Sequence, residues 1–537
     1  MVQDYCYDHS ILRPSQNKNM REIPSDPTHP FRTEFMRDRD RIMFSKAFRR
    51  LGGKTQIFLA NYNDHARNRL THSLEVAKIA RTIARFFNFD VDLAEAIALG
   101  HDLGHPPFGH SGEEALSMIM SGCLAVNGKK FFHKGANGFK HNFQSVRVAV
   151  DLERSLKNKR GLNLTRFTLF GLANHTQSIY KKCNIKHNFT DSQGIKEQKD
   201  LNFCKITKDC SNQFQQYQKD TSFYDRYNDK MKFKQTENFC WSFEAFIVRL
   251  ADEIAQREHD IEDALEMGIM TIDEVIEVIS ELFEDIVNKN KTNKENFDRI
   301  IRDRKQYEII SDINRFIFNL YIWDLTENSA KELLKFLEND ITYYNWKDKY
   351  PEISDQDVKH VISFSDEFFL ADRKFKNFME ERIIRSFAVQ RMDGIGIYII
   401  KNLFEAYLGD PQQMPDKSIV LLYKCCVPED VDVLFESEKK KNREKSIEFY
   451  KYSYKSKGFP DFDEIEDRII PDFEIADSQI IPRIVGELRN RLEIDRHKES
   501  FQPVLMRSIC DYIAGMTDSF AMNEYHNLYG HKCLQIK

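Results

Sequence analysis

Gly-His-Asp-Leu-Gly-His-Pro-Pro-Phe-Gly-His-Ser-Gly-Glu-Glu, residues 100 to 114, contains an adjacent histidine and aspartate. His101 and Asp102 offer an imidazole nitrogen and a carboxylate oxygen to one metal ion. The preceding residues, 91–99, are largely apolar with helical spacing, so a rigid helix can deliver the pair. Two more histidines and two acids follow within the segment. Metal ligands followed closely by acid/base side chains indicate hydrolysis.

Two distant segments complete a ligand set. His72 lies near the start of a predicted helix that opens at residue 69, and Asp252 lies on an apolar-periodic helix. Two nitrogen and two oxygen donors suit a divalent ion between the all-oxygen preference of magnesium and the thiolate preference of soft metals. Taken singly, each feature has a plainer reading: His-Asp pairs occur by chance, and a lone helical Asp is usually solvated or a cap.

Acid/base chemistry is expected at His110 and Glu113. An imidazole exchanges protons near neutral pH, and a carboxylate three residues on can orient the ring if a helix begins here. His110 either positions the attacking water or protonates the leaving oxygen, and both roles stay open. The plainer alternative is that His110 caps the turn after Gly109.

Three nearby residues have competing readings. Arg69 lies three residues before His72, on the same helical face, and can reach phosphate oxygens beside a metal; otherwise it is a surface charge. Lys54 either adds a positive charge or is solvated. His105 either supports the metal ligands from outside or has a structural role beside Pro106.

The ordered motifs of the chain resemble one known family, the HD-domain deoxynucleoside triphosphate triphosphohydrolases, also called dGTPase-like. The matching blocks follow the family's order and span most of the chain, which makes the set more specific than any block alone. They are FSKAFRRLGGKTQIF (44–58), RLTHSLEV (69–76), HDLGHPPFGH (101–110), HNFQSVR (141–147), GLNLT (161–165), LADEIA (250–255), HDIEDA (259–264) and DYIAGMTD (511–518).

The resemblance implies an all-α fold with an HD-domain helical core and a C-terminal helical extension. It implies hydrolysis of a dNTP, with dGTP preferred, to deoxynucleoside and inorganic triphosphate. The cofactor would be one divalent metal ion, Mn²⁺ or Mg²⁺ in the first place, with Fe²⁺, Co²⁺ or Zn²⁺ as alternatives. Homo-oligomers, hexamers or tetramers, are common in the family, and an allosteric nucleotide or single-stranded DNA is a further expected partner.

The resemblance also assigns roles to individual positions. The metal ligands would be His72, His101, Asp102 and Asp252. The catalytic residues would be His110, Glu113 and His141. The residues near the substrate would be Gln56, Arg69, His175 and Asp260, the last at the sugar.

The chain departs from the family pattern at three positions. Lys140 stands where Glu is common, Asn174 where a phosphate-binding Lys is frequent, and Gln256 where many members have Tyr against the deoxyribose. These departures affect what the resemblance implies about triphosphate binding and sugar selectivity, and they do not affect the expected metal site.

Composition limits the remaining classes. The 537 residues are 41% hydrophobic with a net charge of −5, so no global basic field attracts nucleic acid or membrane. The basic run at 438–445 is either a solvated helix face or a contact for nucleic acid or an allosteric nucleotide. Ten scattered cysteines without a CxxC pair predict free thiols and a cytoplasmic location, and no segment is apolar enough for a membrane helix.

The predicted organisation has three parts. They are an irregular segment at 1–30, a catalytic core at 31–290 with a polar insertion at 176–236, and a helical C-terminal region at 291–537. The insertion is expected to be partly disordered or a loose lid. The charged residues 430–485 predict either a short β-hairpin or loops, and Asp393-Gly394-Ile395-Gly396 predicts a helix interruption.

Two other functions compete with dNTP triphosphohydrolysis. One is an HD phosphohydrolase that acts on another nucleotide phosphoester, which would release orthophosphate or pyrophosphate. The other is a non-catalytic scaffold that binds nucleotides or single strands. All four expected ligands and the acid/base pair are present, which argues against the scaffold.

Overall fold

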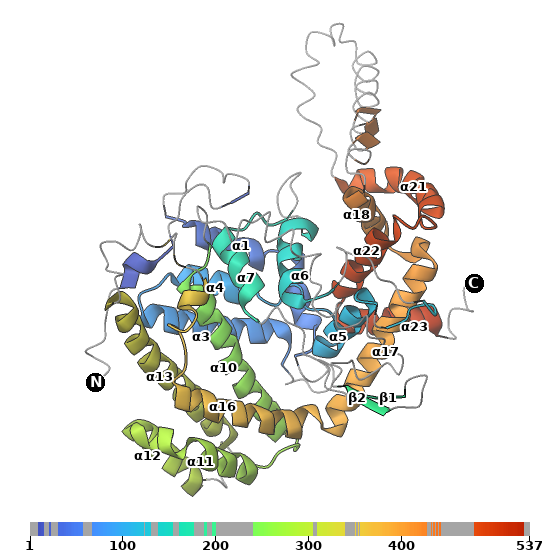
Figure 1. Cartoon of the computed structure of the whole chain (residues 1–537). Helices are drawn as coiled ribbons and strands as arrows, with labels where there is room; N and C mark the ends of the chain where they lie inside the picture. The colour runs from blue at the N-terminus through green and yellow to red at the C-terminus, as the bar shows by residue number, and fades with distance from the viewer. Residues whose placement is uncertain are drawn as a thin grey trace, which may run out of the picture.

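Helices make up nearly all of the described structure, as the sequence predicts (Figure 1). The computed structural model describes residues 9–14, 21–22, 31–56, 67–122, 124–129, 138–153, 161–176, 187–190, 196–199, 240–303, 309–338, 350, 353, 355–426, scattered positions between 431 and 441, and 477–530. Within these residues the only sheet is an antiparallel pair, β1 (His187–Thr190) and β2 (Lys196–Lys199), with His187 opposite Lys199. The all-α prediction is therefore confirmed.

The N-terminal helices include one that is apolar and central, α4 (Val91–Gly100). They are α1 (Glu34–Met43), α2 (Lys46–Arg50), α3 (Arg69–Phe86), α4 (Val91–Gly100), α6 (His141–Arg147) and α7 (Arg166–Asn174). Asn68 starts α3 through a capping box with Thr71, and Asp90 caps the start of α4. Since α4 is apolar almost all round, it is buried against α1, α3 and α7.

A second group of helices extends this core. It comprises α10 (Phe243–Glu266), α11 (Ile272–Lys289), α12 (Lys291–Asp303), α13 (Ile309–Glu338), α15 (Asp355–Val358) and α16 (Asp366–Met379). The long helix α10 packs against α3, α4, α7 and α13 at once. It therefore brings Asp252 beside residues that are far away in sequence.

The C-terminal helices form a second apolar cluster. They are α17 (Phe387–Gly409), α18 (Asp416–Cys426), α21 (Asp477–Asp495), α22 (Gln502–Ala514) and α23 (Asp518–Tyr529), and Figure 1 shows them on the opposite side from α13. One N-terminal helix, α5 (Gly109–Met120), belongs to this cluster through buried Ala115, Leu116 and Ile119. The loop before α5 begins with His101 and Asp102, and it runs from Leu103 in the first apolar cluster to Phe108 in the second, so these residues lie where the two clusters meet.

Short helical turns connect these elements. The 3₁₀ turns are His9–Leu12, Leu51–Gly53 and Pro411–Gln413, and the single π-helical turns are Val148–Leu152 and Glu380–Ile384. The first π turn continues directly from α6.

One local prediction is wrong. Asp393-Gly394-Ile395-Gly396 does not interrupt a helix but lies inside α17. A methyl group at Gly396 would lie 2.7 Å from Phe108 Cβ, so this glycine permits the close approach of α17 to the turn before α5. Most of the segments expected to be an insertion (176–236) or a hairpin or loops (430–485) lie outside the described residues. The predicted domain boundaries stay predictions.

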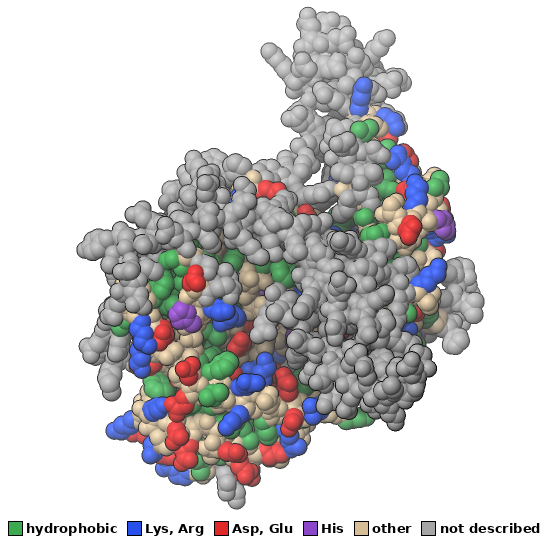
Figure 2. Space-filling model, viewed as in Figure 1, with side chains coloured by type: hydrophobic (Ala, Val, Ile, Leu, Met, Phe, Trp, Pro, Cys, Tyr) green, Lys and Arg blue, Asp and Glu red, His purple; other side chains and the backbone are tan. Residues whose placement is uncertain are grey.

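Charges of both signs are mixed on the surface. On the face in Figure 2, Lys/Arg and Asp/Glu side chains interleave over the lower part, where Figure 1 places α11, α12 and α16. This mixture agrees with the small net charge of −5. None of the helices that the structure describes combines the length and the apolar character that crossing a bilayer requires.

Candidate metal and active site

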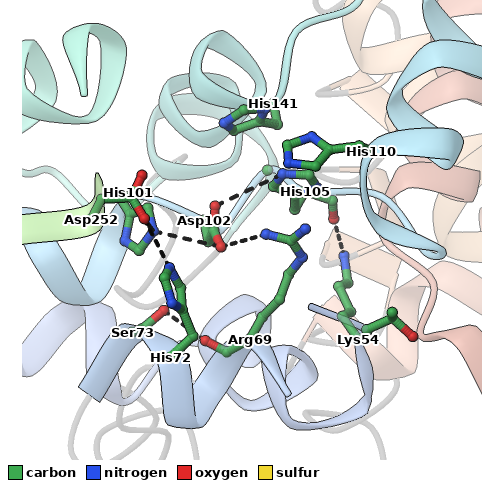
Figure 3. A network of polar contacts seen from close by, with 12 residues as sticks. Lys54, Arg69, His72, Ser73, His101, Asp102, His105, His110, His141 and Asp252 are labelled. Carbon is green, nitrogen blue, oxygen red and sulfur yellow. Dashed lines mark hydrogen bonds and ion pairs between the residues drawn. The ribbon is translucent and has the colours of Figure 1, made fainter. Parts of the chain in front are cut away.

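The four predicted metal ligands converge, although they come from three helical segments. His72 lies on α3, His101 and Asp102 follow α4, and Asp252 lies on α10 (Figure 3). His72 Nε2 is 2.9 Å from Asp252 Oδ1, and His101 Nε2 is 3.5 Å from Asp102 Oδ2 and 3.8 Å from Asp252 Oδ1. All four side chains are buried. His72, His101 and Asp102 also form one of the groups whose ligand atoms could hold a metal ion.

The surroundings favour ionised carboxylates in this cluster. Burial alone would raise the pKa of Asp102, but His101 and Arg69 lower it well below the usual range. Burial likewise opposes ionisation of Asp252, but the hydrogen bond with His72 and the nearby His101 hold its pKa far below the usual value. Two anionic carboxylates therefore face two imidazoles in a buried space.

Arg69 and Gln56 border the ligand cluster. Arg69 is buried, and its Nη1 donates a 2.6 Å hydrogen bond to Asp102 Oδ2, so the surface-charge alternative is excluded. Arg69 Nε and Nη2 and Gln56 Oε1 are buried without a hydrogen-bond partner. A methyl group at Gly109 would lie 3.4 Å from both Arg69 Nη2 and the Gln56 carbonyl oxygen, so the three residues are neighbours.

The acid/base residues form a second cluster around Glu113. His141 Nδ1 is 3.0 Å from Glu113 Oε1, and the His141 backbone N–H donates to the same oxygen at 3.1 Å. His110 Nδ1 is 3.6 Å from Glu113 Oε2, which is a loose contact. The His110 side chain is 72% exposed, whereas Glu113 is buried. His110 does not cap α5, because the residue before the helix is Phe108, which adopts a left-handed conformation with φ 63°.

His141 joins the two clusters. Its Nε2 is 3.2 Å from His175 Nε2, and His175 Nδ1 lies 2.8 Å from the Leu172 carbonyl oxygen. Burial lowers the pKa of His175 to about 3, so this ring is neutral and carries its proton at Nδ1. Asp102, His141 and His175 form a second group whose atoms could hold a cation, and the His105 ring stacks on His141 at 4.2 Å.

The remaining predictions concern Lys54 and Asp260, and the structure shows where each of these residues lies. Lys54 is neither solvated nor directed at open space: its Nζ donates to the carbonyl oxygens of His105 and Ala514, the latter at 2.8 Å. Asp260 lies eight residues after Asp252, roughly 12 Å farther along α10, so it is not among the ligands. Its role at the sugar stays a prediction.

The three residues that differ from the family pattern each make a contact in the structure. Lys140 Nζ lies 3.4 Å from Glu113 Oε1 and so adds positive charge beside this carboxylate. Asn174 Nδ2 turns back to the Phe170 carbonyl oxygen at 2.9 Å. Gln256 Nε2 lies 3.2 Å from each carboxylate oxygen of Asp252 and can hold this ligand in place.

Sequence reasoning missed two kinds of supporting residue. His259 contacts His72 Nδ1, and Glu75 contacts His259 in turn; their helical spacing from Asp252 and His72 could have revealed them. Asp518 accepts hydrogen bonds from the backbone N–H groups of Thr55 and Phe108 at 2.7 and 2.8 Å. No local pattern predicts such a contact across more than 400 residues.

Comparison with known proteins agrees with this geometry. The HD domain family matches residues 69–184, and the phosphohydrolase-associated domain matches residues 362–421 and 484–527. A deoxyguanosinetriphosphate triphosphohydrolase-like protein of Leptospira interrogans is 32% identical over 406 residues, which cover 75% of this chain and 85% of the relative. Proteins of the same name from Brucella canis (32% over 400 residues; 73% and 82%) and Sinorhizobium medicae (33% over 398 residues; 73% and 81%) are similarly related. The chain therefore belongs to the deoxyguanosinetriphosphate triphosphohydrolase-like family of HD-domain phosphohydrolases.

Proposed function

We propose that this protein hydrolyses deoxynucleoside triphosphates, with dGTP preferred, to deoxynucleoside and inorganic triphosphate. One observation carries the proposal: His72, His101, Asp102 and Asp252 converge directly beside the acid/base cluster around Glu113. The names of the relatives agree with this substrate class. The residue roles below are part of the proposal.

The donor set fits a divalent cation. His101 Nδ1 lies 2.7 Å from the Ala98 carbonyl oxygen, which places the ring proton there and leaves the Nε2 lone pair towards the oxygens of Asp102 and Asp252. A lone pair that faces two buried carboxylates is unfavourable unless a cation lies between them. Mixed imidazole and carboxylate donors are compatible with Mn²⁺ or Mg²⁺, the ions expected first, and with Fe²⁺, Co²⁺ or Zn²⁺ as alternatives. When bound, such an ion lowers the pKa of a water molecule and offsets the negative charge on the phosphate.

Arg69 is the residue best suited to grip the phosphate. One nitrogen of its guanidinium is occupied by Asp102, while Nε and Nη2 are buried without partners. A buried N–H without an acceptor is costly, so a phosphate oxygen in this position would be stabilised. Gln56, with its unpaired Oε1 nearby, can accept a hydrogen bond from the nucleotide.

Glu113 would control proton transfer through the two histidines beside it. Because its carboxylate contacts His110 Nδ1 and His141 Nδ1, it can orient both rings: His110 can present Nε2 to the reaction, whereas His141 Nε2 faces His175. His141 is buried beside His175, whereas the His110 side chain is exposed to solvent. His110 either orients the attacking water or gives a proton to the departing 5′ oxygen, and both assignments need the Glu113 contact.

Product analysis tests the proposal. The pure full-length protein is incubated with each dNTP and with Mn²⁺ or Mg²⁺, and the products are separated by ion exchange. Inorganic triphosphate together with deoxynucleoside supports the proposal. Orthophosphate or pyrophosphate would indicate a different HD phosphohydrolase, and nucleotide binding without turnover would indicate a scaffold.

Ligand variants make the test specific. His101→Ala and Asp102→Ala should abolish metal-dependent hydrolysis while circular dichroism stays helical, because each removes a metal ligand. His497→Ala, at an exposed histidine near the end of α21, is the matched control and should retain activity. Near-normal turnover of either ligand variant would remove the metal site from the mechanism.

Assembly and location are separate parts of the proposal. We expect a cytoplasmic homo-oligomer, a tetramer or hexamer, that an allosteric nucleotide or single-stranded DNA can regulate. Mass photometry with and without dNTPs or an oligonucleotide measures the assembly directly.

A further inference from the structure

Behind His72, a line of polar side chains leads away from the metal ligands. His72 Nδ1 is 3.2 Å from His259 Nδ1, and His259 Nε2 contacts a carboxylate oxygen of Glu75. On the other side, His72 Nε2 is 2.9 Å from Asp252 Oδ1. His72 and Glu75 lie on α3, whereas His259 and Asp252 lie on α10. Each of the three contacts in the line therefore joins α3 to α10.

Counting protons shows why this line matters. Two imidazoles between two carboxylates make three polar contacts, and each contact needs one positive or partly positive atom between its partners. Two neutral imidazoles supply only two N–H protons. A cation at the Asp252 end, where His101 also lies, supplies the third.

With a cation at that end, the count sets the position of both ring protons. If His72 binds the cation through Nε2, its proton must be at Nδ1 and is donated to His259 Nδ1. His259 then carries its proton at Nε2 and donates it to Glu75. The orientation of each ring is set by its outer neighbour, as is usual for histidines that bind metals.

The surroundings hold the outer end of the line in place. His72 and His259 are buried, with relative exposures of 0% and 1%, so water does not provide these hydrogen bonds. The Glu75 side chain is 41% exposed and also lies 3.5 Å from Arg67 Nε. Arg67 contacts Glu262 and Asp263 of α10, the latter at 3.1 Å. The line therefore ends in an ionic contact that joins α3 to α10.

We infer that His259 and Glu75 are positioning residues for the metal: they fix the tautomer and orientation of His72 and so set the metal affinity. The inference rests on the proposed metal site. It adds two residues that make no contact with the substrate region but control how strongly the site binds its ion.

The test measures Mn²⁺ binding to the metal-free full-length protein by isothermal titration calorimetry. His259→Leu removes the acceptor and the donor, and Glu75→Leu removes the final acceptor. Both should weaken Mn²⁺ binding by about 10- to 100-fold, the usual range for such supporting residues. His259→Asn keeps an oxygen near the former Nδ1, and Glu75→Gln keeps an acceptor for His259, so both should recover most of the affinity.

A matched control separates positioning from general damage. His9 is also a buried histidine, but it packs against Phe87 and Phe89 near the far end of α3, roughly 22 Å along the helix from His72. His9→Leu should leave Mn²⁺ affinity unchanged. If His259→Leu fails to fold, the test rests on Glu75, whose side chain is half-exposed. Glu75→Leu is then compared with Glu75→Gln.

The outcomes are distinguishable. Unchanged affinity in both leucine variants, or an equal loss in His9→Leu, overturns the inference while the metal site stands. A wild-type protein that binds no divalent ion overturns the proposed site and this inference together.

Discussion

At the residue scale, the groups around Glu113 affect the pKa of its carboxyl more strongly than burial does. Burial alone would raise its pKa, but His141, His110 and Lys140 lower it well below the usual value. The side chain is therefore an anion at neutral pH although it is buried. A fixed anion between two histidines can orient both rings without exchanging a proton itself.

Glu113→Gln should lower turnover far more than it lowers nucleotide binding. The amide keeps the shape but removes the charge that orients His110 and His141, and acid/base assistance is worth about 100- to 10,000-fold. Steady-state kinetics and equilibrium binding measure the two effects separately. Glu114→Gln, at the adjacent exposed position, is the control. A fall in turnover below about threefold, well under the expected range, would make Glu113 a structural residue.

Glu244 predicts a pH effect on stability away from the site. Burial, followed by the charge of Asp90, raises its pKa to about 7 from 4.5. Its stabilising contribution is thus complete below pH 4.5 and is lost as the pH rises through 7. Glu244→Gln, which stays neutral, should gain up to about 3 kcal/mol over wild type between pH 5 and pH 8, measured by urea unfolding. The exposed Glu277→Gln should show no such gain, and an equal difference at both pH values for Glu244→Gln would contradict the assignment.

At the scale of elements, the backbone turn that follows His101 and Asp102 passes very close to the backbone of α6. A methyl group at Gly104 would lie 2.2 Å from the Ser145 backbone nitrogen and 2.4 Å from the His141 carbonyl oxygen. The Gly104 N–H donates to Ser145 Oγ at 2.8 Å, which fixes the crossing. Because α6 carries His141, this contact sets its distance from the metal ligands.

Gly104→Ala should push α6 outward, reduce activity and lower the free energy of unfolding by about 3 kcal/mol, the upper end for overpacking. The cost is high because the obstructing atoms belong to the backbone and cannot rotate away. Gly394→Ala in α17 is the opposite control: nothing lies within 4 Å, so better helix propensity should stabilise by about 0.5–1 kcal/mol. Chemical denaturation of both variants gives the comparison. Wild-type stability for Gly104→Ala would show that the crossing can relax.

The elements themselves were largely predictable, and their contacts were not. Apolar periodicity and caps such as Asn68 and Ser242 mark where α3 and α10 begin, and residue types together with the family resemblance predicted the four candidate ligands that converge. Gly109 favours a left-handed turn, but the left-handed conformation of Phe108 before it could not be predicted, because the Phe108 N–H donates to Asp518 from the far end of the chain. Gly396 suggested a helix break for the same reason, because the residue it packs against, Phe108, is far away in sequence, whereas nothing lies within 4 Å of Gly394.

At the scale of the molecule, the C-terminal cluster closes around the site. Asp518, at the start of α23, is buried and holds both Thr55 and Phe108. Lys54, next to Thr55, donates to Ala514 at the end of α22. The turn before His110 is thus held by residues from the far end of the chain. The sequence could suggest a C-terminal motif of the family, but it could not show which residues that motif contacts.

Asp518→Ala should reduce kcat and lower the free energy of unfolding by a few kcal/mol, because hydrogen bonds to a buried charge contribute about 1.5–3 kcal/mol each. Mn²⁺ affinity should stay near the wild-type value, since the four ligands belong to the other cluster. Asp410→Ala, at a partly exposed cap in the C-terminal region, controls for unspecific damage. Calorimetry measures the Mn²⁺ affinity and kinetics measure kcat on the same samples. A loss of Mn²⁺ binding that accompanies the loss of kcat would contradict the prediction.

The exposure of His110 has a chemical consequence. His72, His101, His141 and His175 are shielded, whereas 72% of the His110 side chain faces solvent. An acylating reagent such as diethyl pyrocarbonate should therefore modify His110 first among these five rings, and inactivation should follow the loss of that one imidazole. A nucleotide bound against His110 would protect this ring, so the labelling rate would measure the fraction of the protein that has nucleotide bound.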